Sequence, residues 1–205
     1  MSKFLPIFLD LRHKSVLLVG GGLVAEEKLI KLLAVGARVK VIARELGPEV
    51  RKLLTDHDLS AEQRSFEDED LNSDLNSYFL VISAVNHPET HTHISNLARA
   101  KGILVNTVDA PLSSDFYFAA QIDRGSLQIA IATEGLFPGV ARSIRLWLEE
   151  LLPADITPEF EDLVKLRQSI RGRIPDAVKR MAALKEQLLV WNSETKNQFL
   201  ENRYE

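Results

Sequence analysis

Residues 14–44, KSVLLVGGGLVAEEKLIKLLAVGARVKVIAR, decide the fold of this chain. They open with an apolar run, residues 16–19, which lies between polar residues and three glycines and predicts a buried strand. Apolar residues at helical spacing over 24–35 predict a helix, and Gly36 stands where a glycine typically ends one. Residues 38–43 are apolar again and predict a second strand. The stretch is therefore predicted to form a strand–helix–strand unit of roughly 30 residues, the building block of parallel sheets.

Three glycines lie at the turn between the first strand and the helix. The pattern Gly20-x-Gly22-x-x-Ala25 has the spacing of a dinucleotide-binding fingerprint, because Gly20 allows a tight turn, Gly22 lets the backbone approach a pyrophosphate, and Ala25 lets the helix lie close to the strand. The helix N-terminus adds free N–H groups and the positive end of its dipole. A turn with a purely structural role is the alternative interpretation. The dinucleotide interpretation assigns cofactor contacts to Gly20, Gly21, Gly22, Leu23 and Val24.

The residues after the second strand bear on the kind of dinucleotide. An Asp or Glu is expected about 20 residues after the glycines, where it would bind the ribose 2′-hydroxyl of NAD. The chain has Arg44 there, followed by Glu45 one residue later than expected. Arg44 could instead bind the 2′-phosphate of NADP. We include Arg44 among the cofactor-binding residues, and these residues alone leave the choice between NAD and NADP open.

Two more apolar strands are predicted at 78–85 and 103–105, with a helix between them at 88–101. Strands that alternate with helices predict an α/β protein with a Rossmann-like, mainly parallel sheet. Ligands of such sheets bind beyond the carboxyl ends of the strands. We therefore expect Ser83, Ala84, Val85 and Asn106 to line the cofactor crevice, with Asp109 at the same edge.

The pattern changes after Asp109. Residues 116–122 and 127–131 predict two strands that are joined as a hairpin, and residues 138–152 predict a helix. Amphipathic helices are predicted after residue 156. Upstream of this region, the acidic residues 67–70 are predicted to form a solvated loop.

The two strands at 116–122 and 127–131 would leave unpaired edges in a monomer. This predicts a homodimer that is held largely by residues 112–152.

Composition excludes several classes of protein. The chain has no cysteine, so it has no disulfide, thiolate metal site or cysteine nucleophile. No apolar run approaches the roughly 18 residues that a membrane helix needs. The first residues lack the layout of a signal peptide, so we expect a cytoplasmic protein without membrane association. The net charge of −4, with no dense Lys/Arg patch, argues against a nucleic-acid partner.

Further motifs surround the glycine unit in a fixed order: LPIFLDL at 5–11, VNTVDAP at 105–111, IDRGSLQIAIATEG at 122–135 and FPGVARSIRLWLEELLP at 137–153. With them the chain resembles the precorrin-2 dehydrogenases, also called sirohydrochlorin ferrochelatases, which occur alone and as the N-terminal half of siroheme synthases. The chain looks like a standalone version. The resemblance implies oxidation of precorrin-2 to sirohydrochlorin with NAD as cofactor, followed in some relatives by insertion of ferrous iron. It also implies three parts, namely a dinucleotide-binding Rossmann domain at 1–111, a small β-rich dimerisation segment at 112–152 and a C-terminal helical domain at 153–205. The implied protein is a homodimer, with an anionic tetrapyrrole substrate held in a cleft between the domains.

The resemblance also points to functional residues. Asp109 matches the functional aspartate of the family and could serve as a general base, whereas a turn residue before Pro111 is the alternative. Thr133 takes the family's hydroxyl position, with a turn-capping role as the alternative. Arg142 and Arg145 lie on one helix face and would bind carboxylates of the substrate, although exposed arginines are often merely solvated.

No metal site is predicted. His87, His91 and His93 are close in sequence, but histidines two residues apart point to different faces of a helix.

Some residues depart from the family pattern. Ala132, Glu134 and Phe137 stand where the family has a hydroxyl, a glycine and a serine. Glu134 adds a negative charge near the expected place of an anionic substrate. These departures favour an alternative, a non-catalytic dinucleotide- or tetrapyrrole-binding protein on the same scaffold, whereas Asp109 favours the enzyme. A dehydrogenase of another small molecule is a third interpretation.

Overall fold

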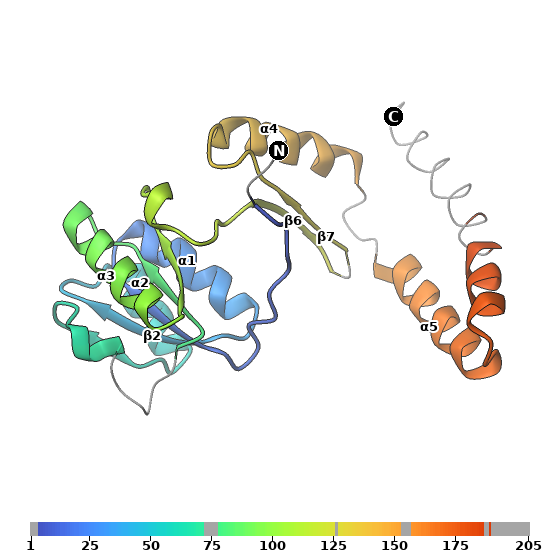
Figure 1. Cartoon of the computed structure of the whole chain (residues 1–205), viewed down its shortest axis with the longest axis horizontal. Coiled ribbons are helices and arrows are strands. Elements are labelled where there is room, and N and C mark those ends of the chain that lie inside the picture. The colour runs from blue at the N-terminus through green and yellow to red at the C-terminus, as the bar shows by residue number, and fades with distance from the viewer. Residues whose placement is uncertain (1–3, 72–77, 126, 153–156, 187–188, 190–205) are drawn as a thin grey trace. The chain divides into compact units, whose positions relative to one another are not determined.

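The computed structural model describes residues 4–71, 78–125, 127–152, 157–186 and 189. The chain divides into two compact units, Met1–Phe118 and Ala119–Glu205 (Figure 1). The finer division into three parts stays a prediction.

The first unit is built on a five-stranded sheet with the order β3-β2-β1-β4-β5. All neighbouring strands are parallel, which confirms the predicted Rossmann-like sheet. Val19 pairs with both Ile42 and Ser83, so the carboxyl ends of the three central strands meet at one edge. The strands are β1 (Ser15–Val19), β2 (Arg38–Ala43), β3 (Ala61–Gln63), β4 (Leu80–Ser83) and β5 (Leu104–Thr107).

Helices cover both faces of this sheet. Along β1 the side chains alternate: Val16 and Leu18 belong to one buried cluster, and Leu17 and Val19 to another. The first cluster includes residues of α1 (Leu23–Ala34) and α2 (Pro48–Asp56), and the second includes residues of α3 (Pro88–Ala100). Because each buried Val or Leu contributes about 1.5–3 kcal/mol, this two-sided core holds β1 and the turn after it in place.

The last residues of the first unit are tied to its core. Phe116 and Phe118 pack against the first cluster, and the Asn106 side-chain amide donates a hydrogen bond of 2.8 Å to the Phe116 carbonyl. The Lys28 ammonium lies 4.7 Å from the centre of the Phe118 ring. These contacts explain why the strand predicted from residue 116 begins only at Ala120.

The second unit contains an antiparallel pair of strands, β6 (Ala120–Arg124) and β7 (Leu127–Ile131), followed by α4 (Pro138–Leu151) and α5 (Thr157–Arg173). Ile122 is fully buried, whereas Trp147 on α4 is 63% exposed. Within the described residues of both units, no helix has the length and apolar character that crossing a bilayer would require.

Candidate functional site

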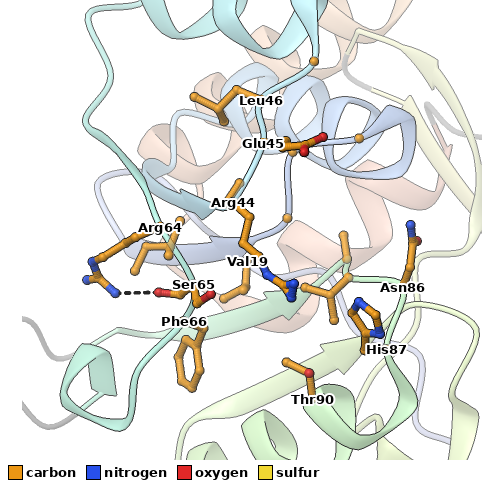
Figure 2. A pocket seen from close by; sticks show the side chains of 18 residues that line it. Val19, Arg44, Glu45, Leu46, Arg64, Ser65, Phe66, Asn86, His87 and Thr90 are labelled. Carbon is orange, nitrogen blue, oxygen red and sulfur yellow. Dashed lines mark hydrogen bonds between the residues drawn. The ribbon is translucent and has the colours of Figure 1, made fainter.

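A cleft of about 570 Å³ opens along the carboxyl edge of the sheet (Figure 2). Its lining comes from residues 19–22, 42–47, 64–66 and 84–87 and from Thr90, all in the first unit. These segments follow β1, β2, β3 and β4, so the cleft lies where doubly wound sheets bind their ligands. The predicted cofactor residues that line it are Gly20, Gly21, Gly22, Arg44, Ala84 and Val85.

The three glycines of the turn have different surroundings. Gly20 has a φ of +129°, and a Cβ there would lie 2.3 Å from the Ala84 carbonyl oxygen. A Cβ at Gly21 would lie 2.2 Å from the Glu45 carbonyl oxygen. A Cβ at Gly22 would meet no atom of the described residues within 4 Å. Packing of the protein therefore accounts for Gly20 and Gly21, whereas the space beside Gly22 is open to a ligand.

The N-terminus of α1 opens at the same place. Gly22 is the N-cap residue, and no side chain among the described residues caps the free N–H groups of the first turn. Leu23 and Val24 supply N–H groups to this turn, while their side chains, 83% and 38% exposed, are absent from the cleft lining. Uncapped N–H groups and the helix dipole together suit a phosphate. This cradle fits the pyrophosphate of a dinucleotide.

The loop after β2 is held against the glycine turn. The Gly20 N–H donates to the Ile42 carbonyl at 2.8 Å, and the Gly47 N–H donates to the Gly21 carbonyl at 2.8 Å. The Arg44 side chain extends from this loop into the cleft (Figure 2). Arg44 is exposed and has no hydrogen bond or ion pair within the part of the chain that the structure describes.

Arg64 lines the cleft from the other side, but its guanidinium is already bound. It donates to Glu62 and Asp70 at 2.8 Å each and to the Ser65 carbonyl at 2.9 Å. Burial raises the pKa of Asp70, but the hydrogen bonds from Arg64 and from the Glu67 backbone outweigh it and hold that pKa below its ordinary value. The predicted solvation of residues 67–70 holds for Glu67, Asp68 and Glu69, which are exposed, but was wrong for Asp70, which is only 9% exposed. Asp68–Leu71 form a 3-10 helix in place of the predicted loop.

A buried polar pair lies behind the cleft at the end of β4. The Ser83 hydroxyl is 2.9 Å from Nδ1 of His91, and Ser83 is fully buried, outside the cleft lining. Burial lowers the pKa of His91, although the Val85 backbone and the charge of Asp109 act in the opposite direction. His91 is therefore a neutral histidine near neutral pH.

Asn106 and Asp109 lie at the adjacent strand end, outside the cleft lining. Asn106 is buried, and its amide holds the Phe116 carbonyl. The Val108 N–H donates to the Ser83 carbonyl at 3.0 Å, which fixes the turn next to β4. Asp109, the next residue, is exposed and has a φ of +59°. Its carboxylate makes no hydrogen bond to the described residues, so it is available to a ligand.

The predicted substrate residues belong to the second unit. The Thr133 hydroxyl donates to the Phe137 carbonyl at 3.0 Å, so it stabilises the start of α4. Arg145 binds both carboxylate oxygens of Glu149 at 2.6 Å. Arg142 is exposed and has no ion pair within the described residues. Of the three, Arg142 alone has its polar group free of a protein partner in that part of the chain.

Sequence reasoning did not assign Arg64, Ser65 or Phe66 to the cleft. They follow β3, whose three residues, Ala61–Gln63, are too few and too polar to show an apolar strand pattern. His87 and Thr90, at the start of α3, also line the cleft. The strand that ends at Ser83 is the signal that could have found them, since segments that follow a strand of a parallel sheet line the crevice. Within the described residues, no three histidines and carboxylates are grouped as a metal site.

Comparisons with known proteins agree with this geometry. Residues 7–120, more than half of the chain, match the family described as "Putative NAD(P)-binding". Siroheme synthase of Chromobacterium violaceum is 38% identical over 174 residues, which cover 85% of this chain and 36% of that protein. Siroheme synthase of Zymomonas mobilis is 34% identical over 188 residues, which cover 92% of this chain and 38% of that protein. The chain thus spans little more than a third of the length of these relatives.

A solved structure shows the same fold. SirC, a precorrin-2 dehydrogenase, superposes with a TM-score of 0.70 at 24% identity, over 97% of this chain and 100% of that one. Together with the glycine turn, the family match confirms the predicted nicotinamide dinucleotide cofactor. The resemblance to siroheme synthases is confirmed as well, and the chain belongs to the NAD(P)-binding family that it matches over residues 7–120.

Proposed function

We propose that this chain oxidises precorrin-2 to sirohydrochlorin with NAD as hydride acceptor. The observation that carries the proposal is the position of the Asp109 carboxylate, which is exposed and unpaired among the described residues. The backbone hydrogen bond from Val108 to Ser83 fixes the preceding residue at the end of β4. Asp109 therefore lies at the same edge of the sheet as the glycine turn. The likeness to siroheme synthases supports the choice of substrate.

Separate residues of the chain would bind the cofactor and accept the proton. The α1 N-terminus and the space beside Gly22 bind the pyrophosphate and so fix the cofactor. NAD, when bound, accepts the hydride. Oxidation of the substrate releases a proton together with that hydride, and the Asp109 carboxylate accepts the proton as general base.

Substrate binding is proposed for the second unit. Arg142 would bind a carboxylate of the tetrapyrrole through a charge-assisted pair of hydrogen bonds. Arg145 would exchange its bond to Glu149 for one to the substrate, which makes its contribution weaker than that of Arg142. Thr133 would act mainly through the α4 N-terminus that its hydroxyl stabilises.

The proposal includes a homodimer formed by residues 112–152. An isolated pair of strands is marginally stable in water, and α4 leaves several apolar side chains exposed beside the pair. These are Val140 (43% exposed), Leu146 (43%), Trp147 (63%) and Leu151 (42%). A second copy of the chain would cover them.

The test is anaerobic incubation with precorrin-2 and NAD, followed by absorbance. We expect the spectrum of sirohydrochlorin to appear together with NADH at 340 nm in equal amounts. Binding of NAD without any turnover would contradict the proposal and favour a non-catalytic binding protein.

Two other functions have an observation of their own. Insertion of ferrous iron into sirohydrochlorin is favoured by Asp109, because the same free carboxylate could accept the protons of the pyrrole N–H groups. A non-catalytic scaffold is favoured by Glu134, which stands in a left-handed conformation, with a φ of +53°, in place of the family's glycine. Iron consumption with sirohydrochlorin present identifies the first, and cofactor binding without turnover identifies the second.

A further inference from the structure

The cationic side chain at the end of β2, Arg44, makes no hydrogen bond or ion pair with the described residues of the protein. Arg44 extends into the cleft (Figure 2), is exposed, and binds no carboxylate among the described residues. Arg64, which lines the same cleft, differs in this respect, since Glu62, Asp70 and the Ser65 carbonyl occupy its guanidinium. Arg44 is therefore the arginine of this cleft that is available to a ligand.

The place of Arg44 relative to the glycine turn is fixed. Hydrogen bonds of 2.8 Å join Gly20 to Ile42 and Gly47 to Gly21, on either side of Arg44. The Arg51 guanidinium adds a bond of 3.1 Å to the Leu46 carbonyl. In a sheet of this order, a dinucleotide with its pyrophosphate at the α1 N-terminus has its adenosine ribose beside the end of β2. Arg44 thus stands next to the 2′ position of that ribose.

The group that would oppose a phosphate there is turned aside. A ribose 2′-hydroxyl is usually bound by a carboxylate at the end of β2, and such a carboxylate repels a 2′-phosphate. Among the described residues, the acidic side chain of the cleft lining is Glu45, and it points in a different direction from Arg44 (Figure 2). Ser65, across the cleft, offers a hydroxyl that has no partner among the described residues.

We propose that this cleft binds the adenosine 2′-phosphate of NADP, with Arg44 as the residue that determines this specificity. Arg44 forms charge-assisted hydrogen bonds with the phosphate oxygens, and Ser65 adds a neutral one. The chain then accepts NADP as well as NAD. The inference rests on the proposed function only in taking the cleft as the dinucleotide site.

The experiment measures binding by calorimetry with two pairs of probes. NADP is compared with NAD, and adenosine 2′,5′-bisphosphate with 5′-AMP, so that the second pair isolates the adenosine end. We expect the 2′-phosphate to tighten binding in both pairs. In Arg44→Ala the ratio of NADP to NAD affinity should fall about tenfold or more, because bonds to a charged group are lost. The affinity ratio of Arg44→Lys should lie between those of the wild type and Arg44→Ala, since lysine keeps the charge and loses the planar guanidinium.

The matched control is Arg38→Ala. Arg38 is exposed at the opposite end of the same strand, so its removal changes the net charge equally without touching the cleft. It should leave the affinity ratio unchanged. Weaker binding of NADP than of NAD by the wild-type protein, or an equal loss in both arginine variants, would overturn the inference. Binding of neither dinucleotide would overturn the cofactor site itself, which separates that failure from this one.

Discussion

The Ser83 hydroxyl, at the last residue of β4, lies 2.9 Å from Nδ1 of His91 on α3, and both residues are buried. The pair joins β4, which ends at the cleft, to α3, which covers the face of the sheet opposite α1 and α2. The hydroxyl donates to Nδ1 while that nitrogen is unprotonated and accepts from it when it carries a proton. The pair thus places a buried titratable ring within the connection between β4 and α3.

The first prediction concerns stability in acid. Burial lowers the pKa of His91 in the folded chain, so the unfolded chain takes up a proton at higher pH than the folded chain does. The free energy of unfolding should then fall as the pH drops below the ordinary histidine value of about 6.5. His91→Asn should flatten this part of the curve, measured by urea unfolding at a series of pH values. The same change at exposed His57 is the control, and an unaltered slope in His91→Asn would contradict the interpretation.

The second prediction separates the glycines of the turn. Gly22→Ala and Gly22→Asp should fold normally, because a Cβ there meets open space, yet both should lose NAD binding in calorimetry. Gly20→Ala should instead destabilise the chain by at least ~2 kcal/mol, since its Cβ meets a backbone oxygen at a positive φ. If Gly22→Asp binds NAD as the wild type does, the turn has a structural role only.

Asp109→Asn is the third prediction. Asparagine tolerates the left-handed conformation of residue 109 as well as aspartate does, so folding and NAD binding should persist. Sirohydrochlorin formation should fall by about 10²-fold or more, because the proton acceptor is lost. Iron insertion, if the wild type performs it, should fall in parallel. Unchanged turnover would leave Asp109 a turn residue.

The fourth prediction concerns Glu134. A residue with a Cβ costs about 1–2 kcal/mol of stability in the left-handed conformation. A glycine avoids this cost but loses more backbone entropy on folding, which costs about 0.5–1 kcal/mol. Glu134→Gly should therefore stabilise the second unit by about 0.5–1 kcal/mol in thermal unfolding. Glu134→Ala removes the charge and keeps the strained backbone, so it should not. Equal effects of the two variants would mean that charge, and not backbone strain, is decisive.

The homodimer gives the fifth prediction. Light scattering at micromolar concentration should give about twice the chain mass of 23.0 kDa. Trp147→Glu should shift this towards the monomer, because it places a charge within the exposed apolar side chains of α4. Val178→Glu, at a similarly exposed apolar position outside residues 112–152, should not. A monomeric wild type would exclude the dimer.

The sequence predicted the centre of the sheet and its cleft because those parts are governed by local pattern. The apolar run of β1, the glycines and the periodicity of α1 each carry their own signal. The same reasoning missed β3 (Ala61–Gln63), because it is an edge strand that pairs only with β2 and its residues are largely polar. It also treated Asp70 as solvated, since no local pattern reveals that Arg64 would pair with it. Contacts between distant residues decide these cases.

The contact of Lys28 with Phe118 has a further consequence. It holds Phe118, the last residue of the first unit, against α1. Every strand of the parallel sheet, both buried clusters and the whole cleft lining lie within residues 4–118. Such a unit is modular in that its sheet, its buried clusters and its cleft are built from its own residues. In the siroheme synthases of Chromobacterium violaceum and Zymomonas mobilis the match covers 85% and 92% of this chain, so the cofactor unit occurs there together with at least part of the second unit, inside a longer protein.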